Sequence, residues 1–179
     1  MLKYVNYDIV FQEVPGEVTL AVNLSGCPNG CPGCHSPYLQ QDVGQELTPA
    51  VLEGWLHRYA GEVTCVCFMG GDAAPQEVAA LATGLRREGM PEIKTAWYSG
   101  RPSLPDGIDP GVFDFIKLGP YEERCGGLRS RTTNQRLYRV ERAETERNTA
   151  SSADGGSSEG TAFGAFRLRD ITARFWRDR

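Results

Sequence analysis

The sequence predicts an α/β fold built on a mostly parallel sheet with an N-terminal β-hairpin. Three observations predict it. Two β-rich runs, residues 3–11 and 17–24, are separated by a short turn that contains Pro15 and Gly16. Further along, apolar strands alternate with amphipathic helices. Each expected strand of the sheet leads into a glycine-containing turn, at the end of the sheet where such folds carry their ligands.

Two segments have helical periodicity. Thr48 and Pro49 provide an N-cap and a first-turn proline, and apolar residues then recur at helical spacing up to Tyr59. A second amphipathic helix is expected to begin at Pro75 and to end near residues 89–91, where a glycine and a proline stand. The apolar face of this helix consists of Val78, Leu81, Ala82 and Leu85.

The remaining strands follow from apolar runs. Residues 62–69, 93–98 and 112–118 are such runs, and residues 136–140 form a shorter one. Because the first two runs alternate with helices, right-handed crossovers predict parallel pairing.

The composition changes after Val140. Residues 141–160 have no periodicity, are rich in Ser, Gly, Glu and Ala, and carry five acidic and two basic residues, a net charge of −3. We therefore predict a domain over 1–140, a flexible acidic linker over 141–160 and an aromatic, arginine-rich tail over 161–179. The tail residues expected to pack back on the domain are Ile171, Phe175 and Trp176.

Length and charge exclude some classes of protein. The chain has 179 residues, enough for one domain with its own core, and a net charge of −4, which argues against a general nucleic-acid binder. No apolar run approaches the roughly 20 residues that span a bilayer. Residues 1–14 alternate polar and apolar side chains, unlike a signal peptide, so we expect a cytoplasmic protein without a membrane partner. In a reducing compartment, clustered cysteines indicate metal binding or catalysis.

Three cysteines stand in the segment SGCPNGCPGCHSP, at Cys27, Cys31 and Cys34. On a cubane [4Fe–4S] cluster, three cysteines bind three irons and leave the fourth open for a substrate. The alternative is a zinc knuckle with a fourth ligand from elsewhere, such as His35 or a distant cysteine. The absence of a second cysteine pair with zinc spacing favours the cluster. The distant cysteines at 65 and 67 alternate on an apolar strand and are expected to be core residues.

The segment GCPNGCPGCHS resembles the cluster motif of the radical S-adenosylmethionine (SAM) enzymes. Within them it resembles the activating proteins of anaerobic ribonucleoside-triphosphate reductase, which likewise have glycine at the position of Gly33, in a C-P-G-C signature. The resemblance extends to about Val140. It implies a [4Fe–4S] cluster on the three cysteines. Complete radical SAM barrels usually carry six βα units and this sequence offers fewer, so the resemblance also implies an incomplete, laterally open βα barrel of partial TIM-like form.

Two further segments resemble SAM-binding motifs. MGGDAAP resembles the family's Gly-Gly-acidic-Pro segment, whose glycine backbone lies against the SAM amino group; this implies cofactor contacts by Gly70, Gly71 and Asp72. Two alanines separate Asp72 from Pro75, a departure from the motif. TAWYSG resembles a strand that ends in Trp-Thr-Gly, with Ser99 in place of threonine, where the serine could hydrogen-bond the cofactor. The alternative is a plain strand–helix turn and a buried aromatic strand.

Lys117 and Asn134 complete the candidate site. In IKLGPY, Leu118 replaces an acid that many relatives have, which leaves Lys117 as the charged group that could meet the SAM carboxylate; the alternative is a surface lysine. RTTNQR resembles the family's Gly-Ser-Ser-Asn-Gln stretch, where Asn134 and Gln135 could bind a polar ligand or a partner backbone. The alternative there is a hydrophilic loop.

The resemblance implies an enzyme. Reductive cleavage of SAM gives methionine and a 5′-deoxyadenosyl radical, which removes hydrogen from a glycine Cα of the large subunit of anaerobic ribonucleoside-triphosphate reductase. The implied partners are this subunit and an electron donor such as a flavodoxin or ferredoxin. Two alternatives stay open: an activase for another glycyl-radical enzyme of the pyruvate formate-lyase type, and a non-catalytic zinc- or cluster-binding module.

Overall fold

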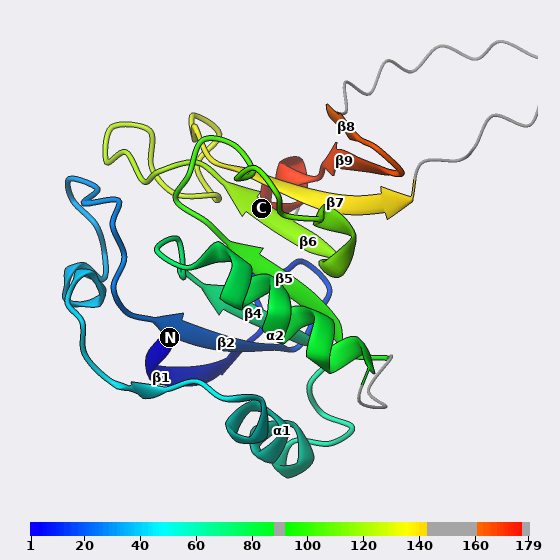
Figure 1. Ribbon diagram of the computed structural model, residues 1–179. Coiled ribbons are helices and arrows are strands. Elements are labelled where there is room, and N and C mark those ends of the chain that lie inside the picture. The colour runs from blue at the N-terminus through cyan, green and yellow to red at the C-terminus, as the bar shows by residue number, and fades with distance from the viewer. Residues whose placement is uncertain (88–91, 143–160, 177–179) are drawn as a thin grey trace, which may run out of the picture.

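The computed structural model describes residues 1–87, 92–142 and 161–176. In this part of the chain, nine strands form one open sheet in the order β3-β1-β2-β4-β5-β6-β7-β9-β8 (Figure 1). The strands are β1 (Lys3–Val10), β2 (Thr19–Leu24), β3 (Gln45–Glu46), β4 (Cys65–Met69), β5 (Lys94–Tyr98), β6 (Phe115–Leu118), β7 (Arg136–Arg142), β8 (Thr161–Phe163) and β9 (Phe166–Asp170). The helices are α1 (Pro49–Arg58) and α2 (Pro75–Arg87), with 3₁₀ turns η1 (Pro37–Gln40), η2 (Pro110–Val112) and η3 (Thr172–Trp176).

The predicted α/β class is confirmed, with a mixed sheet. The four central strands β2, β4, β5 and β6 are parallel neighbours in sequence order. The predicted hairpin of β1 and β2 is antiparallel. At the other side β7 runs antiparallel to β6, and β9 pairs with β7, so the C-terminal stretch does pack back, as a strand of the same sheet. The predicted helix end near 89–91 and residues 143–160 of the linker predicted over 141–160 lie outside the described residues, while Glu141 and Arg142 belong to β7.

Helices α1 and α2 cover the same face of the sheet. Each parallel strand is added on the same side of the preceding one, and right-handed crossovers that advance in one direction place their helices on one face. The Thr48 hydroxyl caps α1 by accepting from Val51 N at 3.3 Å, as predicted. The apolar face predicted for α2 is buried. None of the described helices is long and apolar enough to cross a membrane.

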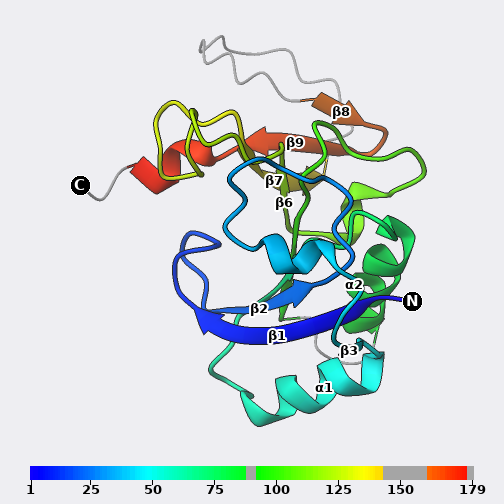
Figure 2. The ribbon, with the colours of Figure 1, turned by 90° about the vertical axis from the view of Figure 1, so that its left-hand side faces the viewer.

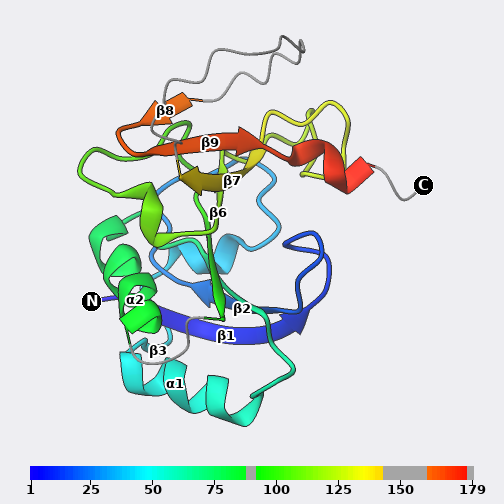
Figure 3. The same cartoon turned by 90° about the vertical axis from the view of Figure 1, so that its right-hand side faces the viewer.

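The core under these helices takes every second side chain of the central strands. It contains Leu20, Val22, Leu24, Val66, Phe68, Trp97, Ile116 and Leu118, together with Leu52, Leu56, Val78, Ala82 and Leu85 from the two helices. The alternate side chains point to the opposite side, here called the inner face. Figures 2 and 3 place η3 and the β1–β2 loop on that side, away from α2.

A second apolar cluster covers part of the inner face. Cys65 and Cys67 belong to it, fully buried, so their prediction as core residues is confirmed. Burial raises the pKa of both thiols. The β1–β2 loop contributes Val14, which is also fully buried, and the C-terminal stretch contributes Ile171 and Phe175, two of the three residues predicted to pack there. The third, Trp176, donates its indole N–H to Leu128 O at 3.0 Å.

Candidate functional site

A pocket of about 200 Å³ opens on the inner face at the carboxyl ends of the parallel strands. Its floor is a row of four side chains from β2, β4, β5 and β6. Asn23 is the register partner of Met69, Met69 of Tyr98, and Tyr98 of Lys117. This is the end of a parallel sheet at which ligands bind in α/β proteins. The loops after these four strands form the wall of the pocket.

All three cysteines of the motif line this pocket. Cys27, Cys31 and Cys34 are free thiols and are partly buried. Their loop is closed at its base, where Gly26 N donates to Gln41 O at 3.0 Å and Cys27 N donates to Leu39 O at 2.9 Å. In Figure 2 the loop lies in front of the sheet, seen from the carboxyl ends of the parallel strands. Among the described residues, no three Cys, His, Asp or Glu side chains converge closely enough to hold a single metal ion.

Two of the three sulfurs face N–H donors. Asn29 Nδ2 lies 3.6 Å from Cys27 Sγ, and Ser36 N lies 3.4 Å from Cys34 Sγ. Such hydrogen bonds tune the sulfur ligands of iron–sulfur clusters. Burial raises the pKa of the Cys27 thiol, and the charges of Asp72 and Cys31 raise it further against the lowering effect of Asn29. Three free thiols on one pocket, two with directed donors, therefore fit an iron–sulfur cluster held by three cysteines.

The ligands considered for a zinc knuckle lie elsewhere. His35 does not line the pocket; its ring packs on Tyr121, with the ring centroids 4.7 Å apart. Cys65 and Cys67 are buried in the apolar cluster of the inner face, and Cys125 lies beside Glu122 in the β6–β7 loop. The pocket thus gathers the three motif cysteines without a fourth cysteine or a histidine in its lining.

Asp72 connects the cysteine loop to the ends of β4 and β5. Its side chain lines the pocket although the residue is only 1% exposed. Oδ1 accepts from Ser99 Oγ at 2.6 Å. Oδ2 accepts from Asn29 Nδ2 at 2.5 Å and from Gly100 N at 2.9 Å. Ser99 is fully buried and does not line the pocket, so it acts on the site by orienting Asp72.

The two candidate glycines have different environments. Gly70 lines the pocket, and its carbonyl accepts from Trp97 Nε1 at 2.7 Å, which fixes this turn to the core. Gly71 has a φ of +83° and faces the core, where an added Cβ would lie 2.5 Å from Val78 Cγ2. Gly71 is therefore needed for close packing, and of the pair only Gly70 lines the pocket.

Lys117 lies in the pocket floor and is 8% exposed, so the alternative of a surface lysine is wrong. Its ammonium donates to Gly119 O at 2.8 Å and to Ser99 O at 3.2 Å. Within the described part of the chain, the third N–H has no protein acceptor. Burial lowers the pKa of Lys117 to about 8, against an opposing effect of the Asp72 charge.

Asn134 does not line the pocket. Its amide donates to Pro120 O at 2.9 Å and to Glu122 Oε1 at 3.3 Å, which braces the β6–β7 loop. Its Oδ1 is buried, with no hydrogen-bond partner among the described residues. The neighbouring Gln135 lines the pocket instead and donates to Gly119 O at 3.4 Å.

Sequence reasoning missed Asn29 and Gly100. Asn29 was visible inside the cysteine motif, but nothing in the sequence pairs it with an acid 43 positions away. Gly100 was visible at the strand end, and its role is a close approach: an added Cβ would overlap Asn29 Nδ2 and lie 2.9 Å from its Cγ. Comparisons of this chain with protein-family models, with curated proteins and with solved structures found no match.

We expect Gly100→Ala to displace the Asn29 side chain and to lower the free energy of unfolding by about 1–3 kcal/mol, because the buried Asp72 carboxylate loses a donor. Asn29→Ala removes the same donor and should cost a similar amount. In the double variant the second change should add little, because no amide is left to clash. Chemical denaturation of the four proteins measures this coupling.

The matched control is Gly54→Ala. Gly54 lies inside α1, and an added Cβ there would meet nothing within 4 Å. This change should stabilise the protein by about 0.5–1 kcal/mol through helix propensity. If the losses in free energy of unfolding caused by Asn29→Ala and Gly100→Ala added up fully in the double variant, the contact between these two residues would be contradicted.

Proposed function

We propose that this protein is a radical SAM activase that generates a glycyl radical on anaerobic ribonucleoside-triphosphate reductase. One observation carries the proposal. The three cysteines with C-x3-C-x2-C spacing line the same pocket as Gly70 and Asp72 of the Gly-Gly-acidic segment, at the carboxyl ends of parallel strands. The two motifs come from different loops and are joined by the hydrogen bond from Asn29 to Asp72.

Each pocket residue has a role in this proposal. The three cysteine thiolates would hold a [4Fe–4S] cluster, and a bound cluster supplies the electron that splits the carbon–sulfur bond of SAM. The Gly70 backbone and the Asp72 carboxylate would receive the SAM amino group. The remaining N–H of Lys117 would donate to the SAM carboxylate. Ser99 orients Asp72.

The fold supports an incomplete, laterally open βα barrel. In a barrel of this kind the helices cover the outside, and the other face of the sheet lines the interior. Here α1 and α2 lie on one face, and the pocket opens on the other. Four parallel strands in sequence order are what part of such a barrel would contain. An open side would admit a glycine-bearing loop of a large partner, as the proposed reaction requires.

Three parts of the proposal rest on the resemblance. These are the reductase subunit as partner, a flavodoxin or ferredoxin as electron donor, and a cytoplasmic location. Contacts of Gly71, Ser99 and Asn134 with SAM stay predictions, and none of these three residues lines the pocket.

The experiment is anaerobic reconstitution with iron and sulfide, followed by addition of SAM and dithionite. The wild-type protein should be brown and should release 5′-deoxyadenosine. Cys27→Ala, Cys31→Ala and Cys34→Ala should each abolish this release, because the cluster loses a ligand. Cys125→Ala is the matched control, since Cys125 lies outside the pocket lining, and it should retain activity.

Two results would contradict the proposal. One is a wild-type protein that carries zinc, or a cluster that does not respond to SAM, which the non-catalytic module predicts. The other is undiminished release of 5′-deoxyadenosine by one of the three pocket-cysteine variants.

A further inference from the structure

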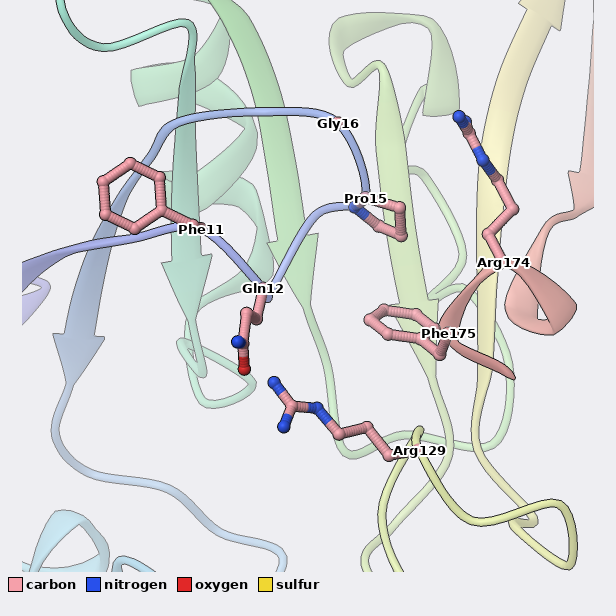
Figure 4. Close-up of a pocket in the computed structure, with 7 residues that line it drawn as sticks. All are labelled: Phe11, Gln12, Pro15, Gly16, Arg129, Arg174 and Phe175. Carbon is pink, nitrogen blue, oxygen red and sulfur yellow. The ribbon is translucent and has the colours of Figure 1, made fainter. Parts of the chain in front are cut away.

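A second hollow of about 280 Å³ opens on the inner face. We call it the arginine groove. It is lined by residues of three separate segments, as Figure 4 shows. The β1–β2 loop forms one wall with residues 11, 12, 15 and 16, and the other wall is formed by Arg129 of the β6–β7 loop and by Arg174 and Phe175 of η3. In Figure 4 the Arg129 guanidinium points toward Gln12.

The backbone on both sides of the groove is anchored. On one side the β1–β2 loop is held by Val14, whose carbonyl accepts from Glu17 N at 3.1 Å, and by Glu13, whose carbonyl accepts from the Tyr98 hydroxyl. On the other side the Trp176 indole donates to Leu128 O at 3.0 Å, which ties η3 to the loop that carries Arg129. The groove is therefore formed before any ligand arrives, and preorganisation lowers the entropic cost of binding.

The polar groups of the groove are left for a partner. Arg129 and Arg174 are exposed, and neither takes part in an ion pair with another described residue. Phe11, at the opposite wall, is 67% exposed. Arginine and aromatic side chains, phenylalanine among them, are enriched at protein interfaces, and a guanidinium can bind a carboxylate with two parallel hydrogen bonds.

Tyr98 places this groove next to the candidate active site. Its side chain lies in the floor of the cysteine pocket, and its hydroxyl donates to Glu13 in the loop that forms one wall of the groove. The groove and the cysteine pocket are therefore linked through one residue, and both open on the inner face, where a protein that inserts a loop into the pocket would dock.

We infer that the arginine groove binds an acidic segment, with an aromatic or apolar side chain beside its carboxylates, of the same protein whose glycine loop enters the cysteine pocket. This inference rests on the proposed function. The carboxylates pair with Arg129 and Arg174, and the apolar side chain packs between Phe11 and Phe175. The groove thus holds the protein substrate through contacts remote from the reacting glycine.

The test is the double charge reversal Arg129→Glu with Arg174→Glu, with the reductase large subunit as the probe. We expect its affinity to fall at least about tenfold and its dependence on salt to weaken. When the concentration of the large subunit is limiting, the yield of glycyl radical should fall with the affinity. When the large subunit is in excess, the yield should recover. Release of 5′-deoxyadenosine under dithionite without the large subunit should stay at the wild-type level. Arg58→Glu, on α1 at the other face of the sheet, is the matched control.

The affinities of the wild-type protein and of the double variant for a flavodoxin are measured in parallel. An unchanged affinity of the double variant for the large subunit overturns the inference. A loss of affinity for flavodoxin alone also overturns it, because it would assign the groove to the electron donor. A wild-type protein that does not bind the large subunit also overturns it. In each case, release of 5′-deoxyadenosine by the wild-type protein shows separately whether SAM cleavage stands.

Discussion

Asp72→Ala is expected to lower the free energy of unfolding of the protein without cofactors by about 3–5 kcal/mol. The carboxylate is 1% exposed and accepts hydrogen bonds from Ser99, Asn29 and Gly100. Its removal takes the acceptor from the buried Ser99 hydroxyl and from two partly buried donors, Asn29 and Gly100, and takes a compensating negative charge from the buried ammonium of Lys117. Chemical denaturation under anaerobic, reducing conditions measures the loss.

The conservative variant separates the charge from the shape. Asp72→Asn keeps one acceptor oxygen but presents an amide to donors, so it should cost about 1–3 kcal/mol. The matched control is Asp106→Ala at an exposed position, which should change stability by less than about 0.5 kcal/mol. Equal stability of Asp72→Ala and the wild-type protein would show that Asp72 does not join the three segments.

The local elements could be predicted from the sequence because their signals are short-range. The Thr48–Pro49 cap, the apolar spacing after Pro75 and the turn at Pro15–Gly16 each act within a few residues, and each marks an element of the structure. The reversal of β7 and the pairing of β9 with it depend instead on contacts between distant segments. No periodicity in residues 136–140 distinguishes a strand antiparallel to β6 from one more parallel strand.

The loops that form the site could be predicted from the sequence, but the directions of their side chains and the hydrogen bonds between them could not. That the cysteine motif and Gly70–Asp72 share a pocket follows from parallel strands that end at one edge of the sheet. The direction of each side chain depends on register and packing. Register places Lys117 in the floor beside Tyr98, although a lysine at a strand end also suits the surface. Packing turns Gly71 toward Val78 and Asn134 toward Pro120.

Lys117→Met should change how stability depends on pH. The pKa of Lys117 is lowered from 10.5 to about 8 in the folded protein, mainly by burial. Between these two values the unfolded chain binds a proton that the folded chain has lost, so this lysine makes stability rise with pH. As the pH rises through that window, the free energy of unfolding of the wild-type protein, minus that of Lys117→Met, should increase by up to about 3 kcal/mol.

The comparison with the variant is essential, because the buried thiols act in the opposite direction. The raised pKa values of Cys65 and Cys67 mean that the unfolded chain loses these protons first, so both thiols make stability fall as pH rises. Both proteins contain these cysteines. The contribution of Cys65 cancels in the difference, whereas the Lys117 charge itself lowers the pKa of Cys67, so that interaction is part of the effect of the lysine. Urea denaturation of the cofactor-free proteins from pH 7 to 10.5 isolates Lys117, with Lys3→Met as control, a change at a partly exposed lysine that pairs with Asp42. A difference that stays flat across this range would show that the pocket floor is open to water, and a hydrated ammonium there would bind the SAM carboxylate only weakly.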